Sequence, residues 1–129
     1  MPFKFLSRKA IEELHRLQIQ RFGGLSGLRD EGSLESAIAR PLYKANYGCE
    51  DVVELASAYL FGLARNHAFL DGNKRIAIVA CGVFLLKNGY ALETTDARLL
   101  EFVIGVAAGE IEEEGATRFL RDLTIPLAR

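Results

Sequence analysis

The segment NKRIAIVACGVFLLK, residues 73–87, decides how the rest of the chain can fold. From Ile76 onward it is apolar on nearly every side, and Asn88-Gly89 follows it. A helix without a polar face must be covered by other elements, and an Asn-Gly pair is a typical helix stop. We therefore predict that residues 73–87 form the central buried helix of an all-α bundle.

The segments on either side carry further helix signals, and only Tyr90–Thr94 is strand-like. The expected helices run from a cap at Ser7 to Gly23-Gly24, from a cap at Ser33 to about Arg40, from a capping box at Asp51 and Glu54 toward His67, from a cap at Asp96 to about Ala108, and from the acids at 112–114 to about Leu123. Pro41 limits the second helix, because a proline disfavours helical geometry in the residue before it. Residues 42–50 are then expected to form a loop that contains Tyr43 and Tyr47.

Composition places the chain among ordinary globular proteins. Its 129 residues are 50% hydrophobic and 26% charged, which predicts a single domain over residues 1–129. The net charge of −1 argues against broad binding to nucleic acid or to anionic membranes. Cys49 and Cys81 match no metal-ligand or redox spacing and suit a reducing compartment. The longest apolar run, Ile76–Leu86, is too short to span a bilayer, and the N-terminus lacks a signal-peptide pattern, so we expect a cytoplasmic protein.

The chemically informative residues lie at the start of the predicted central helix, in RNHAFLDGNKR, residues 65–75. Helix N-termini carry a partial positive charge and usually collect acids, yet Lys74 and Arg75 stand in the first turn of this one. The free amides that follow Asn73, the flexible Gly72 and these two cations together predict a binding site for an anion such as a phosphate chain.

Two further residues of this segment add chemistry that phosphate binding alone does not need. A carboxylate beside bound phosphate is a ligand that Mg²⁺ prefers, so Asp71 is the candidate metal ligand. His67 could accept a proton from an attacking hydroxyl as a general base. Phe69 would anchor the loop in the core, whereas Asn73 can either cap the helix or bind a phosphate, and the sequence alone does not separate these roles.

Each of these residues also has a simpler structural explanation. A histidine between helices is usually structural or solvated, and Asp-Gly-Asn is a common turn and cap signal. Lys74 and Arg75 could be plain surface charges. The functional interpretation rests on the combination, because the cap, the inverted charge, the acid and the histidine all fall within nine residues, 67–75, at the mouth of one helix.

The stretch HAFLDGNKR, residues 67–75, resembles the signature of the Fic/Doc family, His-x-Phe-x-Asp/Glu-Gly/Ala-Asn-Gly/Lys-Arg, at every fixed position. The likeness extends upstream to Phe22-Gly23-Gly24 and to GLRDEGSLESA, residues 27–37, which is similar to the death-on-curing (Doc) subgroup. Lys74 stands where Fic adenylyltransferases have a second glycine, and Ile78 where they have a second arginine. Both departures point to the Doc subgroup.

The resemblance implies a Fic/Doc-type helical bundle that uses ATP and Mg²⁺ to phosphorylate a threonine of elongation factor Tu, and so blocks translation. It implies that His67 is the general base and that Asp71 is the Mg²⁺ ligand. Gly72, Asn73, Lys74 and Arg75 would then hold the phosphates of the nucleotide. Tyr43 and Tyr47 lie where the family keeps a flap that docks the target peptide.

The resemblance also implies a partner, because Doc-type toxins are restrained by a separate antitoxin chain. This sequence lacks the Ser/Thr-x-x-x-Glu-Gly/Asn pattern of the inhibitory helix found in many Fic proteins, so we expect a Phd-like antitoxin. We expect no membrane partner and no direct binding to nucleic acid. Two alternatives stay open: a Fic-type adenylyl or nucleotidyl transferase acting on a protein hydroxyl, and an inactive helical binding module that titrates an antitoxin.

Overall fold

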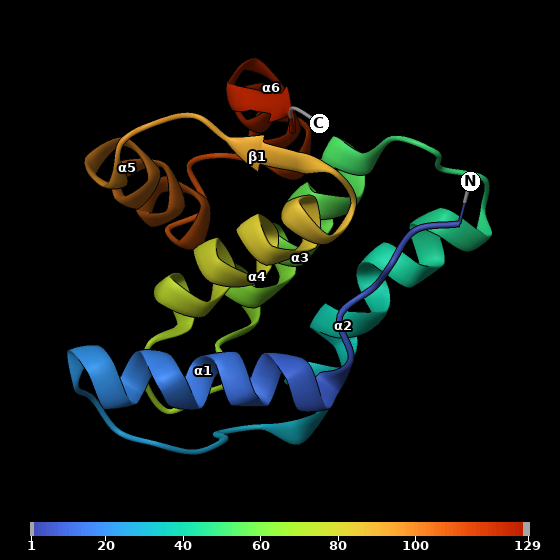
Figure 1. The fold of residues 1–129 in the computed structure, drawn as a ribbon. Coiled ribbons are helices and arrows are strands. Elements are labelled where there is room, and N and C mark those ends of the chain that lie inside the picture. Colours follow the sequence, from blue (N-terminus) through green and yellow to red (C-terminus); the bar gives the residue numbers. More distant parts are fainter. Residues whose placement is uncertain (1, 128–129) are drawn as a thin grey trace.

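The computed structural model describes residues 2–127 and confirms the all-α prediction (Figure 1). The described part contains helices α1 (Arg8–Phe22), α2 (Glu31–Asn46), α3 (Val52–Asn66), α4 (Asn73–Lys87), α5 (Asp96–Ala107) and α6 (Glu113–Leu123), and short strands β1 (Tyr90–Leu92) and β2 (Thr124–Pro126). None of the helices within residues 2–127 has the length and apolar character needed to cross a membrane.

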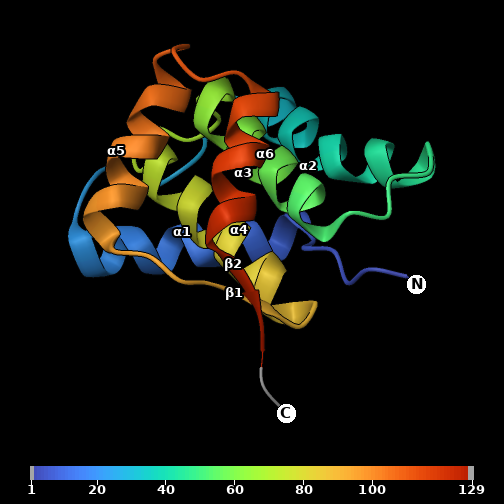
Figure 2. The same ribbon diagram turned by 90° about the horizontal axis from the view of Figure 1, so that it is seen from above.

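The central helix is α3 rather than α4, so the prediction that residues 73–87 are the centre was wrong. Eleven of the fifteen α3 residues are buried, against six of fifteen in α4. Helix α3 packs against α2, α4, α5 and α6, as the two views show (Figures 1 and 2). Small side chains explain this position. A Cβ atom on Gly62 would lie 3.2 Å from the Ala37 Cα atom of α2, so the two helices approach too closely for a larger residue.

The predicted ends of α1, α3 and α4 agree with the structure. Ser7 caps α1, since its hydroxyl accepts a hydrogen bond from the Ala10 amide at 3.1 Å. Asp51 caps α3, because its carboxylate accepts from the Val53 and Glu54 amides. Helix α4 ends at Lys87, directly before Asn88-Gly89, as predicted.

The second helix is longer at both ends than predicted. It begins after Asp30, whose carboxylate accepts from the Gly32 amide at 3.0 Å and from the Ser33 hydroxyl at 2.9 Å. It then continues through Pro41 to Asn46, so residues 42–46 are helical and the expected loop is confined to the residues that follow. Pro41 is buried, and packing against the bundle outweighs the local preference that predicted a break.

The C-terminal third differs from the prediction in small ways. Strand β1 covers only Tyr90–Leu92 and pairs antiparallel with β2, which the sequence did not predict. The cap of α5 is Thr95 rather than Asp96, because the Thr95 hydroxyl accepts from the Arg98 amide at 3.2 Å. Acids do occupy the first turn of α6, as expected.

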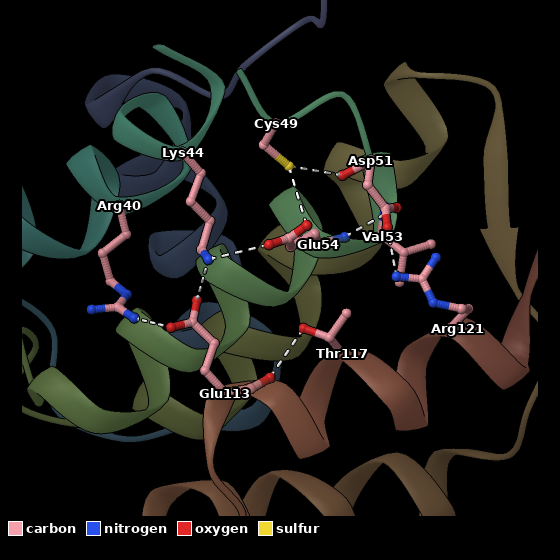
Figure 3. Close-up of polar contacts among 9 residues, drawn as sticks. All are labelled: Arg40, Lys44, Cys49, Asp51, Val53, Glu54, Glu113, Thr117 and Arg121. Atoms are coloured by element: carbon pink, nitrogen blue, oxygen red, sulfur yellow. Dashed lines mark hydrogen bonds and ion pairs between the residues drawn. The ribbon is translucent and has the colours of Figure 1, made fainter. Parts of the chain in front are cut away.

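Ion pairs tie α6 to α2 and to the N-cap of α3 (Figure 3). Arg121 of α6 binds the capping residue Asp51 at 2.5 Å, and Glu113 pairs with Arg40 of α2. Lys44 lies between Glu113 at 3.7 Å and Glu54 at 3.6 Å. The Asp51–Arg121 pair lies at the end of α3 opposite to His67, whereas Arg40 lies farther along that helix, with its guanidinium carbon 5.1 Å from the centroid of the Phe61 ring.

Candidate functional site

Two segments far apart in the sequence lie antiparallel at one end of the bundle, beside α1 (Figure 1). The first is residues 67–72, which link α3 to α4, and the second is the glycine-rich segment 23–30. The Ala68 carbonyl accepts hydrogen bonds from the amides of Arg29 at 2.8 Å and Asp30 at 3.1 Å, and the Leu70 amide donates to the Gly27 carbonyl at 3.0 Å. The loop between α3 and α4 is therefore held by backbone hydrogen bonds to the segment 23–30.

The amide side chain of Asn73 holds the first segment closed. Its Nδ2 donates to the Phe69 carbonyl and its Oδ1 accepts from the Phe69 amide, both at 3.0 Å. The N-cap of α4 is Gly72, in the left-handed region with φ of 73°. The Asn73 side chain therefore does not cap α4 but binds the loop backbone, and phosphate binding by this residue stays a prediction. The Phe69 ring is 3% exposed and lies in the core.

His67 ends α3 in the left-handed region, with φ of 50°, and its side chain is exposed. A residue with a Cβ atom adopts this conformation at a cost of about 1 kcal/mol, so the surroundings must hold it. Arg29 does so. Its Nε donates to the His67 carbonyl at 2.6 Å, and its Nη2 donates to the Asn66 carbonyl at 3.3 Å.

Asp71 presents its carboxylate between the two segments. Oδ1 accepts from the Gly72 amide at 2.9 Å and Oδ2 accepts from the Leu25 amide at 3.2 Å. These two hydrogen bonds, with Arg75 and His15 nearby, hold the pKa of Asp71 below its ordinary value, so the carboxylate is ionised at neutral pH. Gly24 approaches it so closely that a Cβ atom there would lie 2.7 Å from Oδ2.

Lys74 and Arg75 have different surroundings. The Arg75 guanidinium donates to the carbonyls of Gln18 and Gly23, both at 3.2 Å, and so caps the C-terminal end of α1. Lys74 is exposed and makes no ion pair with any residue of the described part. The first helical hydrogen bond at this end runs from Ile76 to Gly72, so the amides of residues 73–75 precede it at the helix N-terminus. That terminus is a site where an anion can bind.

Tyr43 and Tyr47 are not brought to this site. They are 62% and 91% exposed and lie beside Cys49, at the start of α3. His67 ends the same helix, whose fifteen residues span roughly 22 Å. Tyr43 is also part of α2 and not of a loop, so the prediction of a loop at this position was wrong.

Three residues that contact the site were not singled out in the sequence: His15, Gly24 and Arg29. His15 of α1 is 2% exposed, its Nε2 lies 2.7 Å from the Asp71 carbonyl, and its ring stacks on Phe69 with centroids 3.8 Å apart. The sequence did contain a signal that His15 would be buried: it lies four residues after Ile11 and therefore on the same face of α1. Gly24 and Arg29 were noted only as parts of the stretches that resemble the Doc subgroup, and Gly24 also as part of a helix stop; neither was assigned to the site.

The residues present fit a magnesium nucleotide. Within residues 2–127 no group of three or more His, Cys, Asp or Glu side chains could hold a metal ion by itself. Mg²⁺ commonly binds through one or two carboxylates together with substrate phosphates, and the ionised, exposed Asp71 lies directly before the N-terminus of α4. Asp71 would be the protein ligand, and Lys74 with the amides of residues 73–75 would meet the phosphates.

The fold and this loop define a class of protein: an all-α domain in which a histidine, an acid and the start of a helix share one short motif. The sequence model of the Fic/DOC family matches residues 5–85. The chain belongs to this family.

Its similarity to individual proteins places it with the Doc group. Protein kinase doc from Escherichia phage P1 is 34% identical over 121 residues, which cover 93% of this chain and 95% of the phage protein. Toxin Doc from Mycolicibacterium smegmatis is 47% identical over 74 residues, which cover 55% of this chain and 56% of that protein.

Proposed function

We propose that this protein is a Doc-type toxin that transfers the terminal phosphate of ATP to a hydroxyl group of a target protein. One observation carries the proposal: the loop from His67 to Lys74 holds an exposed imidazole, an ionised carboxylate, a free ammonium group and a helix N-terminus within eight residues of sequence. The resemblance to the phage protein named as a kinase, over 93% of the chain, supports the same reaction.

The residues divide the work of phosphoryl transfer. His67 accepts the proton of the target hydroxyl while the hydroxyl oxygen forms a bond to the γ-phosphorus of ATP. The bond from that phosphorus to the β,γ-bridging oxygen breaks, and ADP leaves. Lys74 and the amides at the start of α4 neutralise charge on the phosphates. Asp71 would hold Mg²⁺, which when bound neutralises further phosphate charge.

Arg75 has a smaller part in this proposal than the sequence suggested. Its guanidinium is engaged with the carbonyls of Gln18 and Gly23 of α1, so only its backbone amide is assigned to the phosphates. Gly72 contributes its left-handed backbone and Phe69 anchors the loop. These assignments leave Lys74 as the one cationic side chain of the motif that we place on the nucleotide.

We further propose that the acceptor is a threonine of elongation factor Tu, that its modification blocks translation in the cytoplasm, and that a Phd-like antitoxin chain restrains the toxin. The Doc names of two relatives support a toxin with an antitoxin partner. The acceptor and the compartment rest on the family resemblance of residues 67–75.

Label transfer tests the reaction directly. Purified protein, Mg²⁺ and bacterial lysate are incubated with ATP labelled at either the α or the γ phosphate. Label from γ alone on a protein of the size of elongation factor Tu, lost in His67→Ala, is expected. Label from α would instead establish a nucleotidyl transferase. Toxicity that survives His67→Ala, with no label from either position, would favour an antitoxin-binding module.

A further inference from the structure

We infer that His15 is a positioning residue that holds Asp71 in the orientation needed to bind a magnesium nucleotide. This inference rests on the proposed function of Asp71 as the metal ligand. It starts from the position of His15 in α1, 56 residues before Asp71. The His15 side chain is 2% exposed and lies against residues 67–72, the loop between α3 and α4.

The hydrogen bond of His15 determines its tautomer. A carbonyl oxygen can only accept, so the Nε2 atom that lies 2.7 Å from the Asp71 carbonyl carries the hydrogen and donates it. Because the ring is almost fully buried, water cannot replace this donor at low cost if it is removed. The Asp71 backbone is thus fixed from the core side.

The ring face of His15 acts on the same loop at a second point. It stacks on Phe69 at a centroid distance of 3.8 Å and an interplanar angle of 12°. Phe69 and Asp71 are two residues apart, so one side chain restrains both the anchor and the metal ligand. A Cβ atom on Gly72 would lie 3.4 Å from Nε2, which means that the loop backbone passes tightly over the ring edge.

The carboxylate of Asp71 is restrained by hydrogen bonds of its own. Its two oxygens accept from the amides of Leu25 and Gly72, and both hydrogen bonds are exposed. With the backbone held by His15 and the carboxylate held by these amides, the free lone pairs of the carboxylate keep one direction. Partners that orient a metal ligand in this way commonly change metal affinity by about tenfold or more when they are removed.

Two substitutions separate the donor from the ring. His15→Phe keeps an aromatic face on Phe69 but has no donor, and His15→Gln places an amide donor near the position of Nε2 but has no ring. Leu120→Val of α6 is the control for a general loss of core packing, since Leu120 is fully buried next to Arg121 at the opposite end of α3. His15→Met is a second donor-free variant should His15→Phe not fold.

The first measurement is the affinity for ATP by calorimetry, with Mg²⁺ and with EDTA, on variants that are folded by circular dichroism. We expect His15→Phe to weaken Mg²⁺-dependent ATP binding by about tenfold, His15→Gln to recover most of it, and Leu120→Val to bind as the wild type does. Binding in EDTA should not respond to any of the three. A purely structural histidine would lower Tm and leave the Mg²⁺-dependent affinity of folded His15→Phe unchanged, and this result would overturn the inference.

A second measurement needs no ligand. Hydrogen exchange at the Leu25 and Gly72 amides, which bind the Asp71 carboxylate, should accelerate in His15→Phe relative to Leu120→Val. Unchanged exchange there would also count against the inference. If the wild-type protein binds no ATP with Mg²⁺, the proposed function fails and the inference fails with it. If the wild-type protein binds ATP with Mg²⁺ and the His15 variants bind it equally well, the inference alone fails.

Discussion

The side-chain amide of Asn73 forms a reciprocal pair of hydrogen bonds with the backbone of Phe69, donating to its carbonyl and accepting from its amide, both at 3.0 Å. This pair closes a ring of chain that contains Leu70, Asp71 and Gly72. The position of Asp71 relative to the start of α4 is thereby set within the loop itself.

Asn73→Ala should break this closure. The Phe69 amide and carbonyl belong to a residue that is 3% exposed, so leaving them without partners should lower the free energy of unfolding by about 1–3 kcal/mol. Phosphate transfer should fall further than stability accounts for. Urea unfolding and label transfer measure the two effects.

Asn73→Asp is the matched variant, because it keeps the acceptor and loses the donor. Its stability and its transfer rate should lie between those of Asn73→Ala and the wild type. Wild-type stability in Asn73→Ala would contradict the argument.

Gly24 gives a second prediction, which concerns the Asp71 carboxylate. A Cβ atom at Gly24 would lie 2.7 Å from Asp71 Oδ2, and the backbone φ of 116° disfavours any other residue. Gly24→Ala should therefore push the carboxylate aside and reduce Mg²⁺-dependent activity. Gly48→Ala is the matched control, since Gly48 has a φ of 99° with no atom within 4 Å of the added carbon.

The comparison between these glycine variants isolates the contact from the strain. Both should lose stability through backbone strain, by about 1–2 kcal/mol, in thermal or urea unfolding. Only Gly24→Ala should raise the Mg²⁺ concentration needed for half-maximal transfer. Equal Mg²⁺ requirements in the two variants would show that the close approach of Gly24 to the Asp71 carboxylate does not affect Mg²⁺ use.

Much of the site could be predicted from the sequence because its residues are consecutive. The segment from His67 to Arg75 carries its own turn, helix start and charge pattern, and its relation to α3 and α4 follows from local signals. What could not be predicted depends on tertiary packing. His15 is one such case, because nothing next to it in the sequence tells which carbonyl its ring will meet.

The fold was predictable to a similar extent. Caps at Ser7 and Asp51 act within one helical turn, so they were visible in the sequence. Pro41 was misread because a local preference of a few kcal/mol is outweighed by burying a helix along its whole length. The central position of α3 depends on close approach at Gly62, which is a property of two helices together. A single domain over residues 1–129 stays a prediction.

Arg29 yields a third prediction, on the orientation of His67. Its guanidinium binds the carbonyls of His67 and Asn66, and it holds His67 at a φ of 50°. Arg29→Gln should reduce kcat with little change in the KM for ATP, because the proposed general base His67 loses its orientation while the proposed phosphate site at α4 is intact. The stability cost should stay near 1 kcal/mol because the arginine is exposed.

Steady-state kinetics with a purified acceptor protein would measure this split. Arg16→Gln is the control, since Arg16 is also an exposed arginine in a two-point contact, with Glu13 of its own helix. It should leave both constants unchanged. A rise in KM with normal kcat in Arg29→Gln would mean that Arg29 acts on nucleotide binding instead.

The pair of Asp51 and Arg121 gives a prediction about pH. Partial burial raises the pKa of Asp51, but the Arg121 guanidinium and the amides of Val53 and Glu54 outweigh it, so the pKa lies below its ordinary value of 3.8. A carboxylate with a lowered pKa in the folded state stabilises the protein at pH values above 3.8, and this contribution is lost as the pH falls through the lower folded-state pKa.

Asp51→Asn keeps the oxygen that caps α3 and removes the charge. At pH 7 it should lower the free energy of unfolding by about 0.5–1 kcal/mol, since both side chains are partly exposed. Below the folded-state pKa the two proteins should be equally stable. Urea unfolding across this pH range, with Arg121→Gln completing a double-mutant cycle, measures the effect. A stability difference that stays constant with pH would show that the charge of Asp51 is not its cause.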